Sequence, residues 1–491
     1  NRDDAFRRIS RSFHAVKDSE YAPPVSLQKT LRKYQRDGYR WLRTLDGYGM
    51  GGILADDMGL GKTVQVLSYL LAMKQNGQTL PSLIVCPASL VLNWAEECQK
   101  FTPELSCVVV DGDAAHRAEL AESWPAADLV VTSYDLLRRD EALYEGQEFY
   151  ACILDEAQAI KNHTTQKYKA VCKVHSRVRF ALTGTPVENR LGELWSIFSF
   201  LMPGYLPSYK SFCSRFEKPI VQEEDQTAVR RLNQLTGPFI LRRMKSDVLK
   251  ELPPKTENVY RIELEEEQRK LYLAAVVDAR EKLQAAKPED KMAVFAVLMR
   301  LREICCDPRL IADNWEGGSA KLDACAELVS SAVEGGHRIL LFSQFTSMLE
   351  LLAKRLDAEG ISHFTLQGST PKPVRAELVR RFNGGEVSVF LISLRAGGTG
   401  LNLTAADIVI HYDPWWNVAA QNQATDRAYR IGQQNPVQVY KLIAQDTIEE
   451  KIVELQQAKQ SLADTVTGTA DGAILSMRPD ELLQLLEGSE P

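Results

Sequence analysis

The chain has 491 residues, 45% of them hydrophobic and 25% charged, with a formal net charge of −6 and a pI near 5.8. This is the balance of a globular protein of two or three domains. The acidic total excludes a protein that coats polyanions over its whole surface, although a local basic track remains compatible with it.

The sequence shows no targeting or membrane signal. The N-terminus, Asn-Arg-Asp-Asp, has neither the apolar core of a secretory signal nor an initiator Met, so we expect a fragment of a longer protein. Apolar runs such as 389–394 are strand-sized, far below the ~20 residues that cross a bilayer. The nine cysteines form no C-x-x-C pair, which favours reduced thiols over zinc sites or disulfides. We therefore expect an intracellular protein, in a cytoplasm, nucleoid or nucleus, with no membrane or zinc partner.

Short β-rich runs alternate with helix-like segments in two blocks, which is typical of parallel α/β sheets. Between the blocks, from 191 to 310, apolar residues recur at helical spacing, and the Leu-Pro-Pro-Lys run at 252–255 predicts a hinge. The strand candidates are 52–55, 83–86, 107–111, 129–133, 151–154 and 180–183 in the first block, then 339–343, 364–367, 387–393, 408–412 and 437–443.

These patterns predict an α/β fold with two lobes and helical insertions between them. The expected divisions are an N-terminal extension (1–26), a first, ATP-binding lobe (27–190), helical insertions with the inter-lobe linker (191–310), a second lobe (311–462) and a C-terminal tail (463–491). In such sheets ligand sites lie at the carboxyl ends of the strands, and many of the candidates end in a polar or glycine-rich stretch.

The segment 53–63 predicts a strand, a glycine-containing loop and a helix start. Glycines let backbone N–H groups curl around phosphate oxygens, and the helix N-terminus adds positive potential. Lys62 would reach the β- and γ-phosphates, and the Thr63 hydroxyl would ligate magnesium. Asp56 stands at the first glycine of the G-x-x-x-x-G-K-S/T pattern, so the match is incomplete. The other loop residues expected to bind nucleotide are Asp57, Met58, Gly59, Leu60 and Gly61.

Two adjacent carboxylates, Asp155 and Glu156, follow the apolar run 152–154. Asp155 is placed to hold Mg²⁺, directly or through water, and Glu156 to orient and deprotonate the attacking water. An Asp-Glu pair after a strand is more often a helix cap, but a phosphate loop on a preceding strand favours the catalytic interpretation. Together the two motifs predict ATP hydrolysis.

With these motifs the chain resembles superfamily-two helicase-like ATPases, and more narrowly the SWI/SNF family of double-stranded DNA translocases, over residues 27–460. The resemblance implies two RecA-like lobes. It also implies that Gln35 reads adenine, although a solvated helix residue is the alternative. The motif of Thr183, Gly184 and Thr185 would couple the γ-phosphate to lobe movement, helped by Gln158, which stands where the family often has histidine. The first-lobe residues that would grip DNA phosphates are Ser89, Asn93, Trp94, Thr132 and Ser133, with helix capping as the alternative for Ser89 and Ser133.

Second-lobe motifs extend the resemblance. The string 423–433 places Arg427 and Arg430 three residues apart, hence on one face of a predicted helix. In the family this helix faces the nucleotide held by the other lobe, where an arginine fork bridges phosphate oxygens. The remaining residues that the resemblance assigns are Gly398, Gly400 and Gln423 to the nucleotide, and Ser343, Gln344, Arg395, Asn402 and Trp416 to nucleic acid.

The strings 240–245 and 413–417 resemble SWI/SNF-type ATPases rather than strand-separating relatives. The window 230–250 also gathers six basic residues against one acid: Arg230, Arg231, Arg242, Arg243, Lys245 and Lys250 against Asp247. This window is equally compatible with a phosphate-binding patch and with a brace that contacts the second lobe.

The expected function is therefore a DNA-dependent ATPase that translocates along double-stranded DNA and remodels or displaces DNA-bound proteins, with ATP and Mg²⁺ as cofactors. Two alternatives remain open. One is a helicase that separates strands. The other is an ATP-gated binding module that clamps RNA polymerase or another DNA-bound protein without productive translocation.

Overall fold

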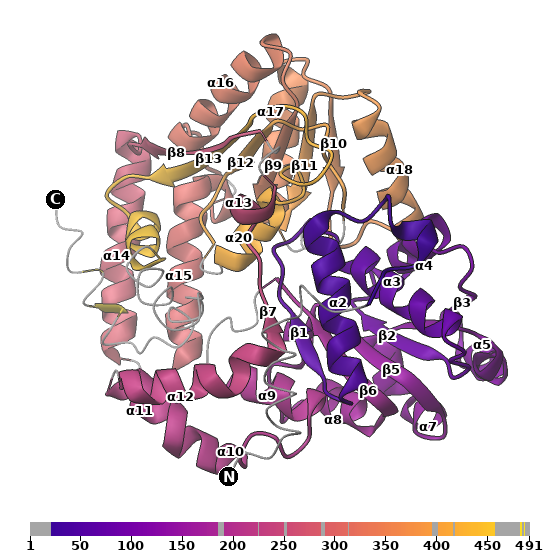
Figure 1. The fold of residues 1–491 in the computed structure, drawn as a ribbon. Helices are drawn as coiled ribbons and strands as arrows, with labels where there is room; N and C mark the ends of the chain where they lie inside the picture. The colour runs from indigo at the N-terminus through magenta and orange to yellow at the C-terminus, as the bar shows by residue number, and fades with distance from the viewer. Residues whose placement is uncertain are drawn as a thin grey trace. The chain divides into compact units, whose positions relative to one another are not determined.

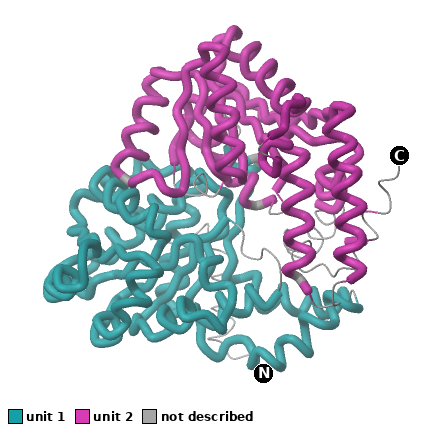
Figure 2. Tube along the Cα trace, turned by 180° about the vertical axis from the view of Figure 1, so that it is seen from behind, with its two compact units in different colours: residues 1–250 teal, residues 251–491 magenta. Residues whose placement is uncertain are grey.

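The computed structural model describes residues 21–184, 191–223, 225–249, 253–285, 290–312, 314–394, 401–415, 418–456, 482–483 and 486. The chain divides into two compact units, Asn1–Lys250 and Glu251–Pro491, coloured separately in Figure 2. Among the described helices, none combines the length and the apolar character that crossing a bilayer requires.

Unit 1 is built on a parallel sheet. Its described strands run in the order β3-β4-β2-β5-β6-β1-β7, and every neighbouring pair among them is parallel. The middle strands are almost continuously apolar because helices cover both faces of such a sheet. The strands are β1 (Gly52–Leu54), β2 (Ser82–Cys86), β3 (Cys107–Val109), β4 (Leu129–Ser133), β5 (Glu148–Asp155), β6 (His175–Leu182) and β7 (Ile240–Leu241), as seen in Figure 1.

The helices of unit 1 alternate with these strands and then continue as a helical run. Helix α3 is buried from Val64 to Ala72, which agrees with the mostly apolar sequence of this stretch, whereas α2 is amphipathic and contacts both α3 and β1. The helices are α2 (Lys33–Gly47), α3 (Lys62–Gln75), α4 (Val91–Phe101), α5 (Ala114–Ser123), α6 (Tyr134–Arg139), α7 (Glu141–Glu145), α8 (Gln166–Lys173), α9 (Leu191–Leu201), α10 (Tyr209–Phe212), α11 (Lys218–Gln222), α12 (Gln226–Thr236) and α13 (Lys245–Val248).

Unit 2 contains a second parallel sheet, with its described strands in the order β10-β11-β9-β12-β13-β8. The strands are β8 (Lys255–Ile262), β9 (Ile339–Ser343), β10 (His363–Leu366), β11 (Val389–Ser393), β12 (Ile408–His411) and β13 (Val437–Ala444). The helices are α14 (Glu266–Ala285), α15 (Lys291–Cys306), α16 (Ala320–Glu334), α17 (Thr346–Ala358), α18 (Lys372–Asn383) and α20 (Val418–Thr425).

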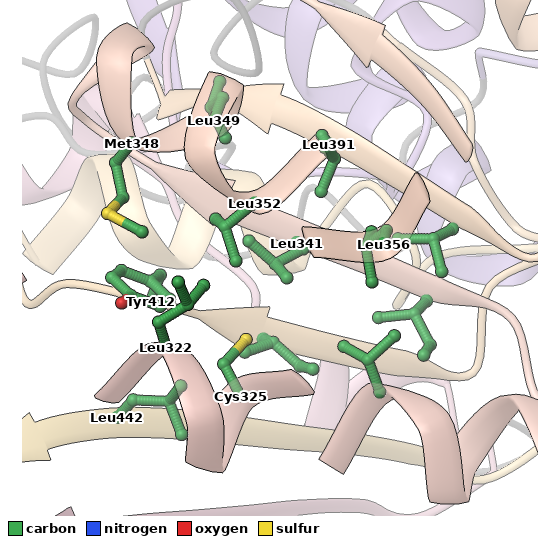
Figure 3. Packing of buried hydrophobic residues seen from close by; sticks show 14 of the residues in the cluster. Leu322, Cys325, Leu341, Met348, Leu349, Leu352, Leu356, Leu391, Tyr412 and Leu442 are labelled. Carbon is green, nitrogen blue, oxygen red and sulfur yellow. The ribbon is translucent and has the colours of Figure 1, made fainter. Parts of the chain in front are cut away.

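Alternate residues of β9 build the core on the two faces of this sheet. Leu341 packs with Leu352 and Tyr412 on the face covered by α16 and α17 (Figure 3). Leu340 and Phe342 belong to a separate cluster on the other face. This is the two-residue period of a strand that is buried on both sides. Burying one leucine stabilises the fold by roughly 1.5–3 kcal/mol, so each face of β9 contributes substantially.

The predicted α/β fold with two parallel-sheet lobes is confirmed, and each predicted strand overlaps an observed one. The segment 191–310, predicted to hold helical insertions and the linker, also contains two strands that were not predicted: β7 is an edge strand of the first sheet and β8 an edge strand of the second. β7 is only two residues long, and β8 (Lys-Thr-Glu-Asn-Val-Tyr-Arg-Ile) is exposed over most of its length, so neither has an apolar pattern. The hinge predicted at 252–255 overlaps the start of β8 at Lys255, while Leu252 lies outside the described residues.

Candidate nucleotide-binding site

Three neighbouring strands of unit 1 end together and bring the predicted catalytic segments to one edge of the sheet. The register pairs Asp155 of β5 with Leu182 of β6, and Leu182 with Leu54 of β1. The phosphate loop therefore begins just beyond the level of Asp155, two strands away. The predicted Thr183 follows β6 at the same edge. The fold thus assembles residues that are up to 129 positions apart along the chain, from Leu54 to Thr183.

The phosphate loop has the backbone that phosphate binding requires. Gly59 and Gly61 have φ of 79° and 75°, a left-handed region that favours glycine, and α3 begins directly afterwards at Lys62. Asp56 has no such conformation, so an aspartate fits at the position where the usual pattern has glycine. Lys62 Nζ donates to the Asp56 carbonyl at 2.6 Å, and Lys62 and Thr63 are half-buried at the start of the helix.

Gln35 supports this loop from α2. Its Nε2 donates to the Leu60 carbonyl at 3.0 Å, and its Oε1 accepts from the Arg32 N–H at 2.9 Å. The Tyr34 hydroxyl donates to the same Leu60 carbonyl at 3.0 Å. Both ends of the Gln35 amide thus bond to protein, while its oxygen keeps a second lone pair that a base could use.

Asp155 is held by two hydrogen bonds to its carboxylate. Trp94 Nε1 donates to Oδ2 at 2.8 Å, the Glu156 N–H donates to Oδ1 at 2.9 Å, and the Tyr134 hydroxyl donates to the Asp155 backbone carbonyl. Desolvation and then the neighbouring Glu156 raise the pKa of Asp155 to about 7, while the Trp94 bond and Lys62 act in the opposite direction. A carboxylate that is partly desolvated and oriented in this way is suited to binding a cation.

The position of Trp94 corrects one sequence prediction. We expected Trp94 to grip DNA, but its side chain is 1% exposed and its indole N–H serves Asp155. A buried tryptophan usually finds a partner for its N–H, and here the partner is the metal-ligand candidate 61 residues away. Trp94 therefore belongs with the candidate nucleotide site rather than with an exposed surface.

A chain of hydrogen bonds connects Glu156 to the end of β6. Gln158 Nε2 donates to Glu156 Oε2 at 2.7 Å, and Thr183 Oγ1 donates to Gln158 Oε1 at 3.0 Å. Glu156 itself has φ of 50°, a left-handed conformation that is uncommon for a residue with a side chain and occurs often at functional sites. Gln158 thus makes the bridge, at the position where the resembled family often has histidine. Gly184 lies beside Met58 of the loop, and Thr185 lies outside the described residues.

Three further residues predicted to contact nucleic acid are instead buried in structural hydrogen bonds. Thr132 accepts from the Tyr144 hydroxyl, Ser133 caps α6 through the Leu136 N–H, and Ser343 Oγ donates to Asp413 Oδ1 at 2.6 Å. Their side chains are 0–3% exposed, so the prediction that they contact DNA is wrong, and they stabilise the local structure instead. Capping was the stated alternative for Ser133. Ser89, Asn93, Gln344 and Asn402 remain at least partly accessible, while Arg395, Gly398, Gly400 and Trp416 lie outside the described residues.

Asp413 connects two second-unit motifs that are 70 residues apart. Besides accepting from Ser343, its carboxylate accepts from the Gln344 N–H at 3.2 Å and pairs with the buried Arg302 at 3.3 Å. Burial raises the pKa of Asp413, and Arg302 counteracts this shift. Arg302 escaped notice in the sequence because it lies within an apolar helix, α15, and its partner is far along the chain.

The predicted helix carrying Arg427 and Arg430 is wrong. Helix α20 ends at Thr425, and successive tight turns follow, with Arg427 N–H bonded to the Ala424 carbonyl and Ala428 N–H to the Thr425 carbonyl. Gln433 fixes this loop by donating Nε2 to the Ala406 and Ala428 carbonyls.

The two arginines of this loop differ in exposure. Arg427 is 3% exposed, whereas Arg430 is half-buried and its Nη1 donates to the Leu401 carbonyl at 3.4 Å. The predicted Gln423 is half-buried on α20. Since the pair does not share a helix face, the two arginines are distinct candidates rather than equivalent ones.

The basic window 230–250 is not one surface. Arg230, Arg231 and Arg242 are exposed, but Arg243 turns inward within unit 1 and pairs with the fully buried Asp56. Arg243 is therefore neither a phosphate-binding surface residue nor a brace reaching away from its own unit. The sequence offered one signal for this contact, since a charged residue in the place of a loop glycine must find a partner if it is buried.

Comparison with known proteins gives a consistent result. The model of the SNF2-related domain matches residues 34–310, and that of the helicase conserved C-terminal domain matches 320–432. The chain is 40% identical over 463 residues to an uncharacterized ATP-dependent helicase of Mycoplasma genitalium and 41% identical over 464 residues to one of Mycoplasma pneumoniae, with 93% of this chain and 44% of each relative covered. It thus spans about half the length of the curated relatives it matches.

A solved structure is similar over most of its length. The SWI2/SNF2 ATPase core of Sulfolobus solfataricus in complex with dsDNA is 36% identical, with 92% of this chain and 96% of that chain covered and a TM-score of 0.46.

Proposed function

The chain belongs to the SNF2-related family of helicase-like, ATP-hydrolysing enzymes, and from this premise we propose that it couples ATP hydrolysis to movement along double-stranded DNA, remodelling or displacing proteins bound there. The observation that carries the proposal is the convergence of the phosphate loop, Asp155, Glu156 and the Gln158–Thr183 bridge on three adjacent strand ends. The duplex in the complex of the archaeal relative supports double-stranded DNA as the track.

The residues of unit 1 fit magnesium as well as nucleotide. Thr63 offers a hydroxyl at the start of α3, and each carboxylate oxygen of Asp155 keeps acceptor capacity beyond the one N–H that it binds. Oxygen donors of this kind are those that Mg²⁺ prefers. Bound there, the ion would neutralise phosphate charge. Lys62 would exchange the Asp56 carbonyl for phosphate oxygens.

Hydrolysis would proceed through the carboxylate of Glu156. It is held by Gln158 at 2.7 Å and by its left-handed backbone, so it is oriented before the nucleotide arrives. We propose that it positions the attacking water and accepts its proton. The bridge through Gln158 to Thr183 would then report the state of the γ-phosphate to the segment after β6. Arg427 and Arg430 would stabilise the charge that develops in the transition state.

The proposed DNA grip falls on the residues that remain accessible. Ser89 lies two residues before α4, Asn93 lies in the first turn of α4, and Gln344 and Asn402 lie beyond the ends of β9 and β11. Their short polar groups suit contacts to phosphate that do not read sequence. The exposed Arg230, Arg231 and Arg242 would add positive charge to such a track.

The test is steady-state phosphate release with no nucleic acid, single-stranded DNA, duplex DNA and duplex RNA. We expect strong stimulation by duplex DNA that rises with its length, together with displacement of a triplex-forming strand. Unwinding of a fork would favour a strand-separating helicase instead. ATPase activity that ignores DNA length would favour an ATP-gated binding module and contradict translocation.

The contact between Trp94 and Asp155 gives a second test. Trp94→Phe keeps a buried ring but removes the donor to the carboxylate. A hydrogen bond to a charged group contributes about 1.5–3 kcal/mol, so we expect turnover to fall about 10- to 100-fold.

Trp124→Phe is the matched control, measured by the same phosphate-release assay and by thermal melting. Trp124 is also 1% exposed, and its Nε1 has no hydrogen-bond partner within the described part of the chain. Its replacement should leave turnover unchanged. Equal activity of the two variants would remove Trp94 from the site.

A further inference from the structure

Asp56 is fully buried directly before the phosphate loop, and a guanidinium fork binds its carboxylate. Arg243 Nε donates to Oδ1 at 2.8 Å and Nη2 donates to Oδ2, while Gln65 Nε2 from α3 donates to Oδ2 at 3.1 Å. Arg243 Nη2 also donates to Gln65 Oε1 at 2.7 Å, and Nη1 donates to the Tyr34 carbonyl. The three side chains form one network in which each charged group is bonded.

The backbone on either side continues this attachment. The Leu241 carbonyl accepts from the Ala55 N–H at 2.7 Å, and the Arg243 carbonyl accepts from the Asp57 N–H at 3.0 Å, so β7 extends as a parallel ladder along the loop. The Lys245 N–H donates to Asp57 Oδ2 at 2.9 Å. The segment 241–245, near the end of unit 1, is thus bonded to Ala55 and Asp57 at every second residue.

Helix α2 is shaped to admit the network. A Cβ on Gly38 would lie 1.8 Å from Gln65 Oε1 and 2.8 Å from Arg243 Nη2, distances at which the side chains would have to move. Glycine inside a helix otherwise lowers its stability. Gly38 is present here because the side chains of the network leave no room for a Cβ.

Without Arg243, the negative charge of Asp56 would disfavour nucleotide binding. The Asp56 carbonyl accepts a hydrogen bond from Lys62 Nζ, so the carboxylate of Asp56 belongs to a residue that directly contacts a phosphate-binding group. A buried anion there would repel a polyphosphate, since charges interact strongly where water is excluded. Pairing with a bidentate arginine neutralises it and fixes the peptide to which Lys62 bonds.

We propose that Arg243 is a positioning residue of the phosphate loop, which neutralises Asp56 and holds the loop against the segment 240–245 in the form that binds nucleotide. The inference rests on the proposed nucleotide site but not on DNA translocation. It assigns to Arg243 an effect on nucleotide affinity that a purely structural ion pair would not have.

The experiment measures equilibrium binding of a fluorescent ADP to the whole chain, without DNA, alongside thermal melting. Arg243→Met should weaken ADP binding about tenfold or more at temperatures where the variant is folded. Adding Asp56→Asn to this variant should restore most of the lost affinity, because no unpaired buried carboxylate then lies beside the phosphate loop. Should Arg243→Met fail to fold, Arg243→Lys keeps the charge without the fork and should show an intermediate loss.

The matched control is Arg117→Met. Arg117 is 3% exposed and makes an equivalent fork to Asp140, with Nε–Oδ2 of 2.6 Å and Nη2–Oδ1 of 2.9 Å, beside β3 at the opposite edge of the same sheet. It should lose thermal stability and keep its ADP affinity.

Unchanged ADP affinity in folded Arg243→Met, or an equal loss in Arg117→Met, would overturn the inference. A double variant as weak as Arg243→Met would overturn the electrostatic role. A parent chain that binds no ADP would instead contradict the nucleotide site itself.

Discussion

Glu156→Gln is expected to reduce ATP turnover about 10²- to 10⁴-fold while leaving ATP affinity nearly unchanged, because it removes the base and little else. Glutamine has the size of glutamate, and its Oε1 can still accept from Gln158 Nε2, which now bonds to Glu156 at 2.7 Å. The backbone at φ 50° need not change either. The measurement is steady-state phosphate release with duplex DNA, next to equilibrium binding of a fluorescent ATP analogue.

Glu148→Gln is the control for this variant. Glu148 begins the same strand, β5, and is exposed at the end of the strand opposite to the site. Its neutralisation should alter neither turnover nor affinity. Near-normal turnover in Glu156→Gln would mean that another group accepts the proton. A parallel loss of ATP affinity would point instead to a rearranged loop.

The sequence was sufficient to predict that the strand ends around Glu156 lie at one edge of a sheet. Apolar runs followed by polar residues located β1, β5 and β6, and parallel sheets bring such ends to one edge. The order of the strands was not predictable in this way. It depends on which apolar faces pack best, and these contacts join residues far apart in the chain.

Side-chain roles were harder to predict because burial decides them. Trp94 and Ser133 are residue types that could serve DNA or the fold equally well. Each proved to be buried and bonded within its own unit, to Asp155 and to the Leu136 N–H. Local spacing carries no information about a partner 61 residues away, as with Trp94, or 187 residues away, as with Arg243 and Asp56.

The arginine motif shows a different limit of sequence reasoning. Residues 418–425 do form a helix, but its continuation through Arg427 and Arg430 is replaced by turns. The Thr425 hydroxyl bonds to His411 Nε2 at 2.8 Å, and Gly432 has φ of 104°. These tertiary bonds and a left-handed glycine outweigh the helical preference of the local sequence.

Arg430→Ala is expected to lower DNA-stimulated turnover about 10³-fold or more while ATP binding is nearly retained, because an arginine finger stabilises mainly the transition state. Arg430 Nη1 donates to the Leu401 carbonyl at 3.4 Å, and because the Arg430 side chain is only half-buried, its removal should not unfold the loop. Arg430→Lys should restore little, since an ammonium lacks the planar fork. The same phosphate-release and ATP-binding assays measure both variants.

Comparison with Arg427→Ala separates a catalytic effect from a structural one. Arg427 is 3% exposed, so its replacement should also lower the melting temperature, whereas that of Arg430 should not. Arg380→Ala is the surface control, because Arg380 pairs with Glu377 on the exposed face of α18 and such pairs contribute little. If Arg430→Ala retained turnover, Arg430 would not be the group that stabilises the charge of the transition state. If only Arg427→Ala lost turnover without losing stability, the buried arginine would be the finger.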